Sequence, residues 1–304
     1  MSTTKKIVVV TGGAGFIGSH LARVLLSEKY VVKIVDNLSG GKRERIPEDA
    51  EFFGQDINDT TALTKVMKGA DFVFHFAALP RVQYSIEHPL ETDTANVHGT
   101  VSVLKAAHDA GVRRVVYSAS SSAYGDQAVM PLTEDMSASP KSPYGLQKYI
   151  GELYCRVFSE VYGLPTVSLR YFNVYGSGAS TEGAYALVIA KFLKQRSLGE
   201  PMTITGDGTQ TRDFTHVRDV VRANILAAHS KRVGKGEVIN IGAGKNASVL
   251  HIAKLIGGPT THIEPRLEPH DTLADNSRAR ELLGWSPNVT LEDGIAELKK
   301  EFGL

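Results

Sequence analysis

The sequence predicts an α/β fold, in which a doubly wound parallel sheet is followed by a smaller α/β lobe. Short apolar runs rich in β-branched residues alternate with longer amphipathic stretches through the first 175 residues. This rhythm is typical of parallel strands covered by helices on both faces. After Gly176 the rhythm changes, and glycine, serine and threonine cluster at Gly176–Gly183 and Thr203–Thr211. The 304 residues are enough for one large domain or two modest ones.

The individual elements follow from these runs in chain order. Strands are expected at Ile7–Thr11, Val31–Asp36, Asp71–Ala78, Val115–Ser118, Thr166–Tyr175 and Glu237–Gly242. Helices are expected at Phe16–Ser27, Thr94–Ala110, Tyr144–Tyr162 and Leu291–Phe302. We expect the chain to cross between the two parts more than once, so that part of 214–242 rejoins the sheet.

Composition excludes several classes of protein. Lys and Arg total 34 and Asp and Glu total 33, and this near-neutral balance argues against a polybasic nucleic-acid binder. The single cysteine, Cys155, excludes an intrachain disulfide framework and a cysteine-rich zinc site. The apolar run near the start stops at glycines after four residues, too short for a signal peptide or a membrane span. A cytoplasmic globular protein with no membrane partner is expected.

A glycine-rich turn joins the first strand to the first helix. Gly12, Gly15 and Gly18 allow a tight turn, close approach of the backbone to a pyrophosphate, and packing of helix on strand. Asp36 ends the next strand, where an acid accepts hydrogen bonds from the adenosine ribose and repels a 2′-phosphate. The pattern predicts a Rossmann-type site for NAD rather than NADP. The alternative is a structural βαβ turn without a ligand.

A tyrosine and a lysine lie four residues apart in the expected helix Tyr144–Tyr162. Tyr144 and Lys148 therefore share one helix face, where an ammonium can lower the pKa of the phenol and make it an acid or base. Ser120 follows the strand Val115–Ser118, and strand carboxyl ends are where such sheets bind ligands. Without these neighbours, an exposed helix face would explain the tyrosine and lysine equally well.

Taken in order, these motifs resemble a known superfamily. The residues that carry the resemblance are Gly12, Gly15, Gly18, Asp36, Asp56-Ile57, Phe76-Ala77-Ala78, Ser120–Ser122, Tyr144, Lys148 and Arg170-Tyr171-Phe172-Asn173, with Gly206–Asp219 and Leu273-Ala274-Asp275 extending the match. The chain resembles the extended short-chain dehydrogenase/reductases, and within them the UDP-glucose/UDP-N-acetylglucosamine 4-epimerases. The resemblance implies an NAD-binding Rossmann domain at 1–175 and a nucleotide-sugar-binding lobe at 176–304.

The resemblance also implies which residues bind NAD. Phe16 and Ile17 would meet the pyrophosphate, Asp36 and Asn37 the adenosine ribose, and Asp56 and Ile57 the adenine. The rest of the dinucleotide would be lined by Phe76, Ala77, Ala78, Ser118, Tyr144, Lys148 and Phe172. Asn96 lies near a family asparagine that contacts the cofactor, but it is one position out of register and is left out.

The implied reaction is NAD-dependent 4-epimerisation of a UDP-hexose through a 4-keto intermediate. Tyr144 would take the proton of the sugar O4 hydroxyl while C4 gives hydride to NAD, which later returns it to the other face. Lys148 would hold the cofactor ribose and lower the pKa of Tyr144, and Ser120 would hydrogen-bond O4. Substrate contacts would come from Ser120, Ser121, Ser122, Asn173, Leu187, Val188, Thr203, Thr205, Arg212, Arg266, Glu268 and Thr272.

The choice of sugar stays open at this point. Thr272 is small where a bulky residue would exclude N-acetyl groups, which favours UDP-GlcNAc and UDP-GalNAc beside UDP-glucose and UDP-galactose. Glu182 would repel a hexuronate, whereas Arg81 points to the opposite preference. Three alternatives remain: a UDP-hexuronate 4-epimerase, a nucleotide-sugar keto-reductase, and a non-catalytic NAD-binding regulator.

Two further expectations concern chemistry and assembly. A dehydratase or decarboxylase is disfavoured because Ser121-Ser122-Ala123 lacks the carboxylates that those reactions use, and the histidines are not spaced for a metal site. The resemblance implies a homodimer, in which Thr94–Ala110 and Tyr144–Tyr162 pair with their copies in a four-helix interface.

Overall fold

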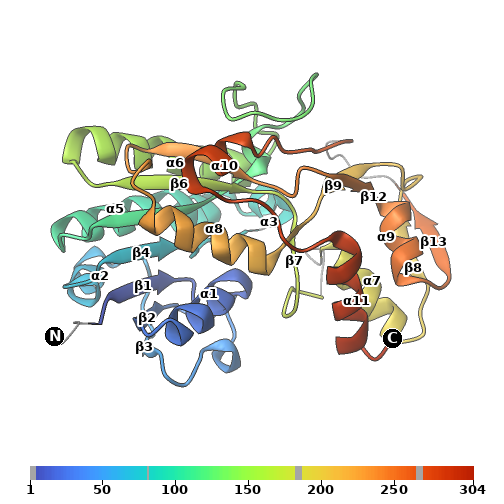
Figure 1. The fold of residues 1–304 in the computed structure, drawn as a ribbon, viewed down its shortest axis with the longest axis horizontal. Coiled ribbons are helices and arrows are strands. Elements are labelled where there is room, and N and C mark those ends of the chain that lie inside the picture. The colour runs from blue at the N-terminus through green and yellow to red at the C-terminus, as the bar shows by residue number, and fades with distance from the viewer. Residues whose placement is uncertain (1–4, 81, 182–186, 265–269) are drawn as a thin grey trace.

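The computed structural model describes residues 5–80, 82–181, 187–264 and 270–304, and its core is a seven-stranded sheet (Figure 1). Every strand pair in this sheet is parallel. In spatial order the strands are β11 (Glu237–Ile241), β6 (Thr166–Tyr171), β5 (Arg114–Ser120), β4 (Phe72–His75), β1 (Ile7–Thr11), β2 (Val31–Val35) and β3 (Glu51–Phe53). The predicted doubly wound α/β fold is confirmed.

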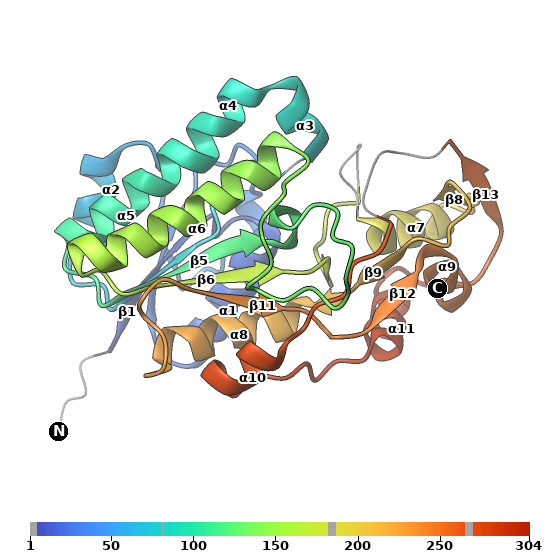
Figure 2. The same ribbon diagram turned by 90° about the horizontal axis from the view of Figure 1, so that it is seen from above.

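Helices cover both faces of the sheet, as Figure 2 shows from above. One face carries α2 (Thr60–Met67), α5 (Gly99–Asp109) and α6 (Pro143–Tyr162), and the other carries α1 (Phe16–Ser27), α8 (Val217–His229) and α10 (Ser277–Leu283). Side chains alternate between the two apolar cores, since Val8 and Val10 of β1 face the α1–α8 side and Val9 faces the α5–α6 side. Both faces are buried, which explains the uninterrupted apolar strand Ile7–Val10.

A smaller group of elements lies beside the sheet in Figure 1 and has its own apolar core. It contains α7 (Val188–Ser197), β8 (Met202–Thr205), β9 (Thr211–Asp213), β12 (Asn246–Ser248), α9 (Val249–Ile256), β13 (Thr260–Ile263) and α11 (Leu291–Glu301). Between the two groups, β7 (Val174–Tyr175) pairs in parallel with β10 (Thr215–His216), after which α8 and β11 return the chain to the sheet. No helix in the described part of the chain is long and apolar enough to cross a membrane.

Three expected elements are wrong in extent, whereas the others agree to within two residues. The expected strand Thr166–Tyr175 divides into β6 and β7, because Asn173 has a φ of 22° and leaves the extended region. The expected helix Thr94–Ala110 starts with one π-helical turn, η2 (Thr94–His98), before α5 begins. Only four residues of Asp71–Ala78 are strand, because the chain turns away from the sheet after His75.

Short elements connect the strands to the helices. They are η1 (Arg43–Arg45), α3 (Val82–Glu87), α4 (Pro89–Asp93) and η3 (Ser121–Ala123). Because the strands are parallel, their carboxyl ends meet at one edge, where Thr11, His75 and Ser120 end β1, β4 and β5. This edge is the place where open α/β sheets bind ligands.

Candidate active site

The glycine turn after β1 requires glycine at two of its positions. Gly12 has a φ of +71°, and a Cβ on it would lie 2.6 Å from the amide nitrogen of Ala77. A Cβ on Gly18 would collide with the carbonyl oxygen of Gly12, so α1 could not pack on the turn. The spacing therefore serves close packing of strand, turn and helix.

Helix α1 begins without any side-chain cap. Gly15 is its N-cap residue, and no acidic side chain lies in the first turn, which starts at Phe16 and Ile17. The first N–H groups of such a helix attract an anion, and a Cβ on Gly15 would lie 3.1 Å from the carbonyl oxygen of Gly12. These features fit the pyrophosphate of NAD.

Asp36 lies directly after β2 and beside this turn. Its two carboxylate oxygens accept the N–H groups of Ala14 at 2.9 Å and Leu38 at 2.8 Å, which fixes the carboxylate next to the helix start. Asn37 donates its side-chain amide to Asp56 at 3.1 Å, so these two predicted residues also adjoin. Each carboxylate oxygen of Asp36 keeps a lone pair that can accept a ribose hydroxyl.

A buried histidine organises the segment that follows β4. The Thr11 hydroxyl lies 2.7 Å from Nδ1 of His75, and the Thr100 hydroxyl lies 3.0 Å from Nε2. Because the Thr100 hydroxyl donates to the carbonyl oxygen of Asn96, Nε2 must donate and Nδ1 must accept. Burial, and then Lys148, lower the pKa of His75 to about 3. The imidazole is therefore neutral and ties β1 and β4 to α5.

The predicted residues Phe76 and Ala77 start directly after this histidine. The Phe76 ring stacks on Tyr171 with a centroid distance of 6.4 Å. The Ala77 amide lies against Gly12, and its N–H donates to the Thr11 hydroxyl at 3.4 Å. The glycine turn and the start of the segment Phe76–Ala78 are thus in contact.

Tyr144 and Lys148 lie in the first turns of α6, which the local sequence positions. Ser142 caps the helix by accepting the Gly145 N–H at 3.1 Å, and Pro143 provides a pre-set first helical residue. The buried Ser85 of α3 accepts the N–H of Tyr144 at 3.0 Å. Helix α6 therefore starts at a fixed place relative to α3.

Ser120 lies next to the Tyr144 hydroxyl. Burial raises the pKa of Tyr144, and its hydrogen bond with the Ser120 side chain opposes that shift. Ser120 in turn donates to the hydroxyl of Ser122 at 3.1 Å and accepts the Ser122 N–H at 3.2 Å. A tyrosine and a serine thus form one hydroxyl pair at the carboxyl end of β5.

The Lys148 ammonium is buried against β5, the strand that ends at Ser120. It donates to the carbonyl oxygen of Ser118 at 2.9 Å and lies 5.1 Å above the Tyr117 ring. Burial lowers the pKa of Lys148 from the usual 10.5 to about 8, against smaller opposing effects of Cys155 and Glu152. The expected action of Lys148 on the Tyr144 pKa stays a prediction, because in this structure its donor is directed at Ser118.

Glu152, one turn further along α6, forms a buried ion pair with Arg170 of β6. The two guanidinium–carboxylate distances are 2.8 and 2.6 Å, and both side chains are at most 3% exposed. The pair ties α6 to the strand that leads into Phe172 and Asn173. Phe172 is fully buried and packs against Tyr124.

Two of the predicted substrate residues, Arg212 and Thr272, lie next to each other at β9. Nη1 of Arg212 donates to the carbonyl oxygens of Thr211 and His270 at 2.8 and 2.9 Å. Thr272 is held beside it, with its N–H on the Thr211 carbonyl at 3.2 Å. The Thr211–Arg212 strand and the Thr272 segment therefore form one continuous surface.

The other predicted substrate residues are more scattered. Gln195 bonds both the N–H and the hydroxyl of Thr203, and the Thr205 carbonyl accepts Gln210 at 2.9 Å. Leu187 is 39% exposed, and the following residue, Val188, begins α7. Arg81, Glu182, Arg266 and Glu268 lie outside the described residues.

Sequence reasoning left out Asn96, whose side chain the structure places against Leu79. Its side chain is 1% exposed and bonds both the N–H and the carbonyl oxygen of Leu79, just after the predicted cofactor segment. Asn96 lies in the π-helical turn η2, and such turns are frequent at functional sites. The available signal was the family asparagine near Asn96, which was set aside because Asn96 is one position out of register.

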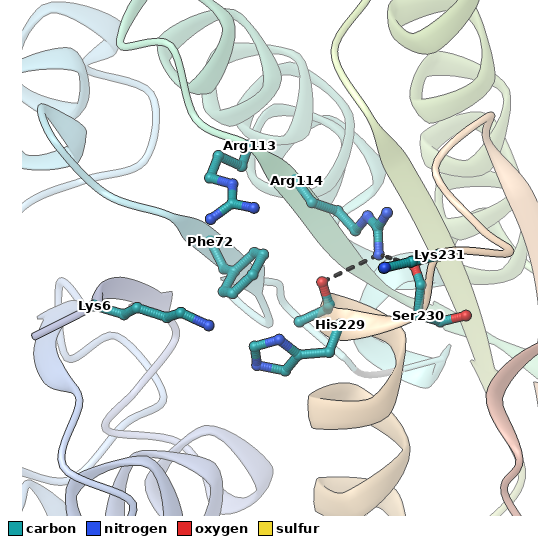
Figure 3. Close-up of a pocket in the computed structure, with 8 residues that line it drawn as sticks. Lys6, Phe72, Arg113, Arg114, His229, Ser230 and Lys231 are labelled. Atoms are coloured by element: carbon teal, nitrogen blue, oxygen red, sulfur yellow. Dashed lines mark hydrogen bonds between the residues drawn. The ribbon is translucent and has the colours of Figure 1, made fainter. Parts of the chain in front are cut away.

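A cavity of about 190 Å³ lies away from this site, at the amino ends of β4 and β5 (Figure 3). It is lined by Lys6, Phe72, Arg113, Arg114, Ala228, His229, Ser230 and Lys231. Arg114 donates to the carbonyl oxygens of Ala227, Ala228 and Ser230, and so caps the end of α8. We assign Arg114 a structural role.

Among the described residues, no three His, Cys, Asp or Glu side chains are placed to share a metal ion.

The chain is similar to UDP-sugar epimerases over nearly its whole length. Residues 8–242 match the model of the NAD dependent epimerase/dehydratase family. The UDP-glucose 4-epimerase of Mycolicibacterium smegmatis is 38% identical over 312 residues, which cover 97% of each chain. The UDP-N-acetylglucosamine 4-epimerase of Methanobrevibacter ruminantium, in complex with UDP-N-acetylmuramic acid, has a TM-score of 0.93 and 36% identity over 98% of both chains. The UDP-glucuronic acid 4-epimerase of Bacillus cereus, in complex with UDP-glucuronic acid and NAD, has a TM-score of 0.89 and 34% identity over 98% of this chain and 99% of that one. The resemblance of the motifs is therefore confirmed, and the chain belongs to the NAD-dependent epimerase/dehydratase family.

Proposed function

We propose that the protein catalyses NAD-dependent 4-epimerisation of a UDP-hexose, with Tyr144 as the acid/base. One observation carries the proposal: Tyr144 and Ser120 share a hydrogen bond at the carboxyl end of β5, on the strand edge that also carries the glycine turn, and the buried Lys148 is bonded to the Ser118 carbonyl of the same strand. When bound, NAD would accept hydride from C4 of the sugar and return it to the opposite face.

The residues of this chain would hold the sugar and the cofactor in position and would transfer the proton of the O4 hydroxyl. Tyr144 would take the O4 proton in the first half-reaction and give it back in the second, with Ser120 hydrogen-bonded to the same oxygen. Lys148 would hold the cofactor ribose and favour the phenolate. No second acid is needed, in agreement with the absence of carboxylates at Ser121 and Ser122.

We also propose how the chain divides between the two ligands. Residues 1–175, together with part of 214–242, would bind NAD, and 176–304 would bind the UDP-sugar. Arg212 supports this division, because its planar guanidinium suits a diphosphate and it lies on the surface shared with Thr272. Asn173, at the junction of β6 and β7, would meet the diphosphate from the other side.

The sugar class rests on Thr272 and on the relatives. A small side chain at Thr272 supports acceptance of both hexoses and N-acetylhexosamines. The second candidate is a UDP-hexuronate, which the likeness to the Bacillus cereus enzyme favours at 34% identity. A keto-reductase would use the same residues for one half-reaction only.

A second copy of the chain is the proposed partner. Helix α6 exposes apolar side chains at helical spacing, among them Leu146, Tyr154, Val157 and Val161. Contacts of α6 with α5 place both helices on the same outer face of the sheet, where pairing with their copies would bury this stripe.

The test is an assay of UDP-hexoses, UDP-N-acetylhexosamines and UDP-hexuronates with the wild-type protein and Tyr144→Phe. We expect interconversion of 4-epimers by the wild type without net consumption of NAD. Tyr144→Phe should lower kcat by about a hundredfold to ten-thousandfold, because it removes the proton-transfer group and leaves the ring in place. Its NAD content should stay unchanged.

Two results would count against the proposal. Wild-type protein that converts no UDP-sugar, or that consumes NADH stoichiometrically on a keto-sugar, would exclude an epimerase. Full activity of Tyr144→Phe would move the acid/base role to another residue. Tyr154→Phe, a matched substitution on the outer face of α6, should leave kcat unchanged.

A further inference from the structure

We propose that Gln147 is a positioning residue for the reaction: through Asn96 it holds the cofactor-lining segment after β4 in register with Tyr144 and Lys148. This inference rests on the proposed function, and it assigns a role to a residue within the Tyr144–Lys148 turn that the motif leaves unspecified. It is supported by a continuous series of buried hydrogen bonds that runs from Leu79 through Asn96 and Gln147 to Thr92.

Asn96 is the centre of this chain. Its side-chain oxygen accepts the Leu79 N–H at 2.7 Å, and its amide nitrogen donates to the Leu79 carbonyl at 3.2 Å and to Oε1 of Gln147 at 2.8 Å. Nε2 of Gln147 donates to the Thr92 hydroxyl at 3.0 Å. Asn96, Gln147 and Thr92 are 1%, 3% and 0% exposed, so water does not compete for these bonds.

The direction of each bond is dictated by main-chain groups at the two ends. The single proton of the Thr92 hydroxyl is shared between the carbonyl oxygens of His88 and Pro89, both at 3.1 Å, so this hydroxyl can only accept from Gln147. Gln147 must therefore turn its oxygen toward Asn96, and Asn96 must turn its nitrogen toward Gln147. This leaves the Asn96 oxygen facing the N–H of Leu79, where it is needed.

Leu79 and Gln147 lie next to the two parts of the site whose separation the proposed reaction needs to be fixed, the cofactor-lining segment and the Tyr144–Lys148 turn. Leu79 follows Phe76–Ala78, which lies against the glycine turn, and Gln147 immediately precedes Lys148 on α6. The π-helical turn places Asn96 between them, and its carbonyl oxygen accepts the Thr100 hydroxyl that supports His75. Without the Gln147 link, α6 and the segment after β4 would be joined by fewer oriented contacts.

The test is Gln147→Met, which keeps the length and apolar stem of the side chain and removes both amide groups. Loss of the two buried hydrogen bonds of Gln147, to Asn96 and to Thr92, should weaken NAD binding about tenfold and lower kcat about tenfold. The KM for the UDP-sugar should stay within about twofold. Gln83→Met, the same change at an exposed glutamine of α3 that bonds only Glu87 among the described residues, should alter none of these values.

A second variant shows whether the residues act as a chain. Thr92→Val removes the acceptor that orients Gln147, so it should weaken NAD binding in the same direction by a smaller factor. In the double variant Thr92→Val/Gln147→Met, the loss should equal that of Gln147→Met alone, because Thr92 acts only through Gln147. If Gln147→Met does not fold, Thr92→Val alone decides the proposal by the same NAD titration.

A lower melting temperature with unchanged NAD affinity and kcat would make Gln147 a purely structural residue and overturn the proposal. Additive losses in the double variant would overturn it as well. Direct titration of NAD separates this failure from failure of the proposed function, because it needs no substrate. Absent epimerase activity with a tenfold loss of NAD affinity would retain the positioning role and reject only the reaction.

Discussion

At the scale of the residue, the burial of Lys148 costs the folded protein stability. Its ammonium is 3% exposed and has the Ser118 carbonyl as a hydrogen-bond acceptor, while the nearest carboxylate along the helix, Glu152, is bonded to Arg170. A cation buried with so little compensation destabilises the folded state. Such a cost is expected where the charge serves binding or catalysis rather than folding.

Replacing Lys148 should therefore stabilise the protein while inactivating it. A pKa lowered from 10.5 to about 8 corresponds to about 3 kcal/mol at about 1.4 kcal/mol for each pH unit. Loss of the Ser118 hydrogen bond offsets about 1 kcal/mol of this gain. In the absence of NAD, the free energy of unfolding of Lys148→Met at pH 7 should thus be about 2 kcal/mol higher than that of the wild type, as measured by urea denaturation.

The difference in the free energy of unfolding between Lys148→Met and the wild type should also depend on pH. Between pH 8 and 10.5 the unfolded wild-type chain holds a proton on Lys148 that the folded chain has lost, so the wild-type free energy of unfolding rises with pH there. Lys148→Met lacks this rise, and its advantage should shrink as the pH approaches 10.5. Lys105→Met, at an exposed lysine, should show no such convergence. A variant less stable than wild type at pH 7 would contradict the argument.

At the scale of elements, the contact between the start of α6 and the turn after β5 determines the position of Tyr144. A Cβ on Gly145 would lie 2.7 Å from the carbonyl oxygen of Ser122 and 3.2 Å from the Pro140 side chain. Backbone cannot move aside as a flexible side chain can, so only glycine allows the helix to approach the serine turn this closely.

Gly145→Ala should consequently lower kcat at least about tenfold, although alanine favours an isolated helix by about 1 kcal/mol. The added methyl group would push the first turn of α6 away from Ser122 and lengthen the Tyr144–Ser120 contact. The measurements are kcat and the melting temperature, which should also fall. Leu146→Ala, at the exposed neighbouring position, should leave kcat unchanged. If Gly145→Ala were active and more stable than the wild type, the turn at Ser122 would be able to move aside for the added methyl group, which would contradict this prediction.

The elements that sequence reasoning predicts well are those whose own pattern decides their structure. Ile7–Thr11 and Phe16–Ser27 have the expected bounds because a buried parallel strand and an amphipathic helix each have a distinct period. The break at Asn173 and the π-helical turn at Thr94–His98 were missed because tertiary contacts decide them. Asn173 leaves the sheet where β7 finds a new partner in β10.

The candidate site shows the same division. Glycine spacing, Asp36 and the Tyr144–Lys148 pair could be predicted because each needs a specific residue type at a fixed offset along the chain. Asn96 and Gln147 could not, since each is a single amide whose partners lie at other places in the chain. Their role depends on a network that exists only after β4, η2 and α6 have assembled.

At the scale of the whole molecule, the outer face of α6 exposes a stripe of apolar side chains. Leu146, Tyr154, Val157 and Val161 are 47%, 37%, 42% and 70% exposed, and their spacing keeps them on one side of the helix. The formal net charge of +1 gives little long-range repulsion between copies. A contiguous apolar stripe on a long helix is a feature of association surfaces.

Val157→Glu should accordingly convert the proposed dimer into a monomer. Two copies related by a twofold axis would each bury this glutamate near the other, so that desolvation and like-charge repulsion both oppose pairing. Light scattering should give about twice 32.9 kDa for the wild type and 32.9 kDa for the variant. Val129→Glu, at a 64% exposed valine outside the helices, should stay dimeric. A wild-type mass of 32.9 kDa, or a Val157→Glu protein that still pairs, would place any partner of the stripe elsewhere.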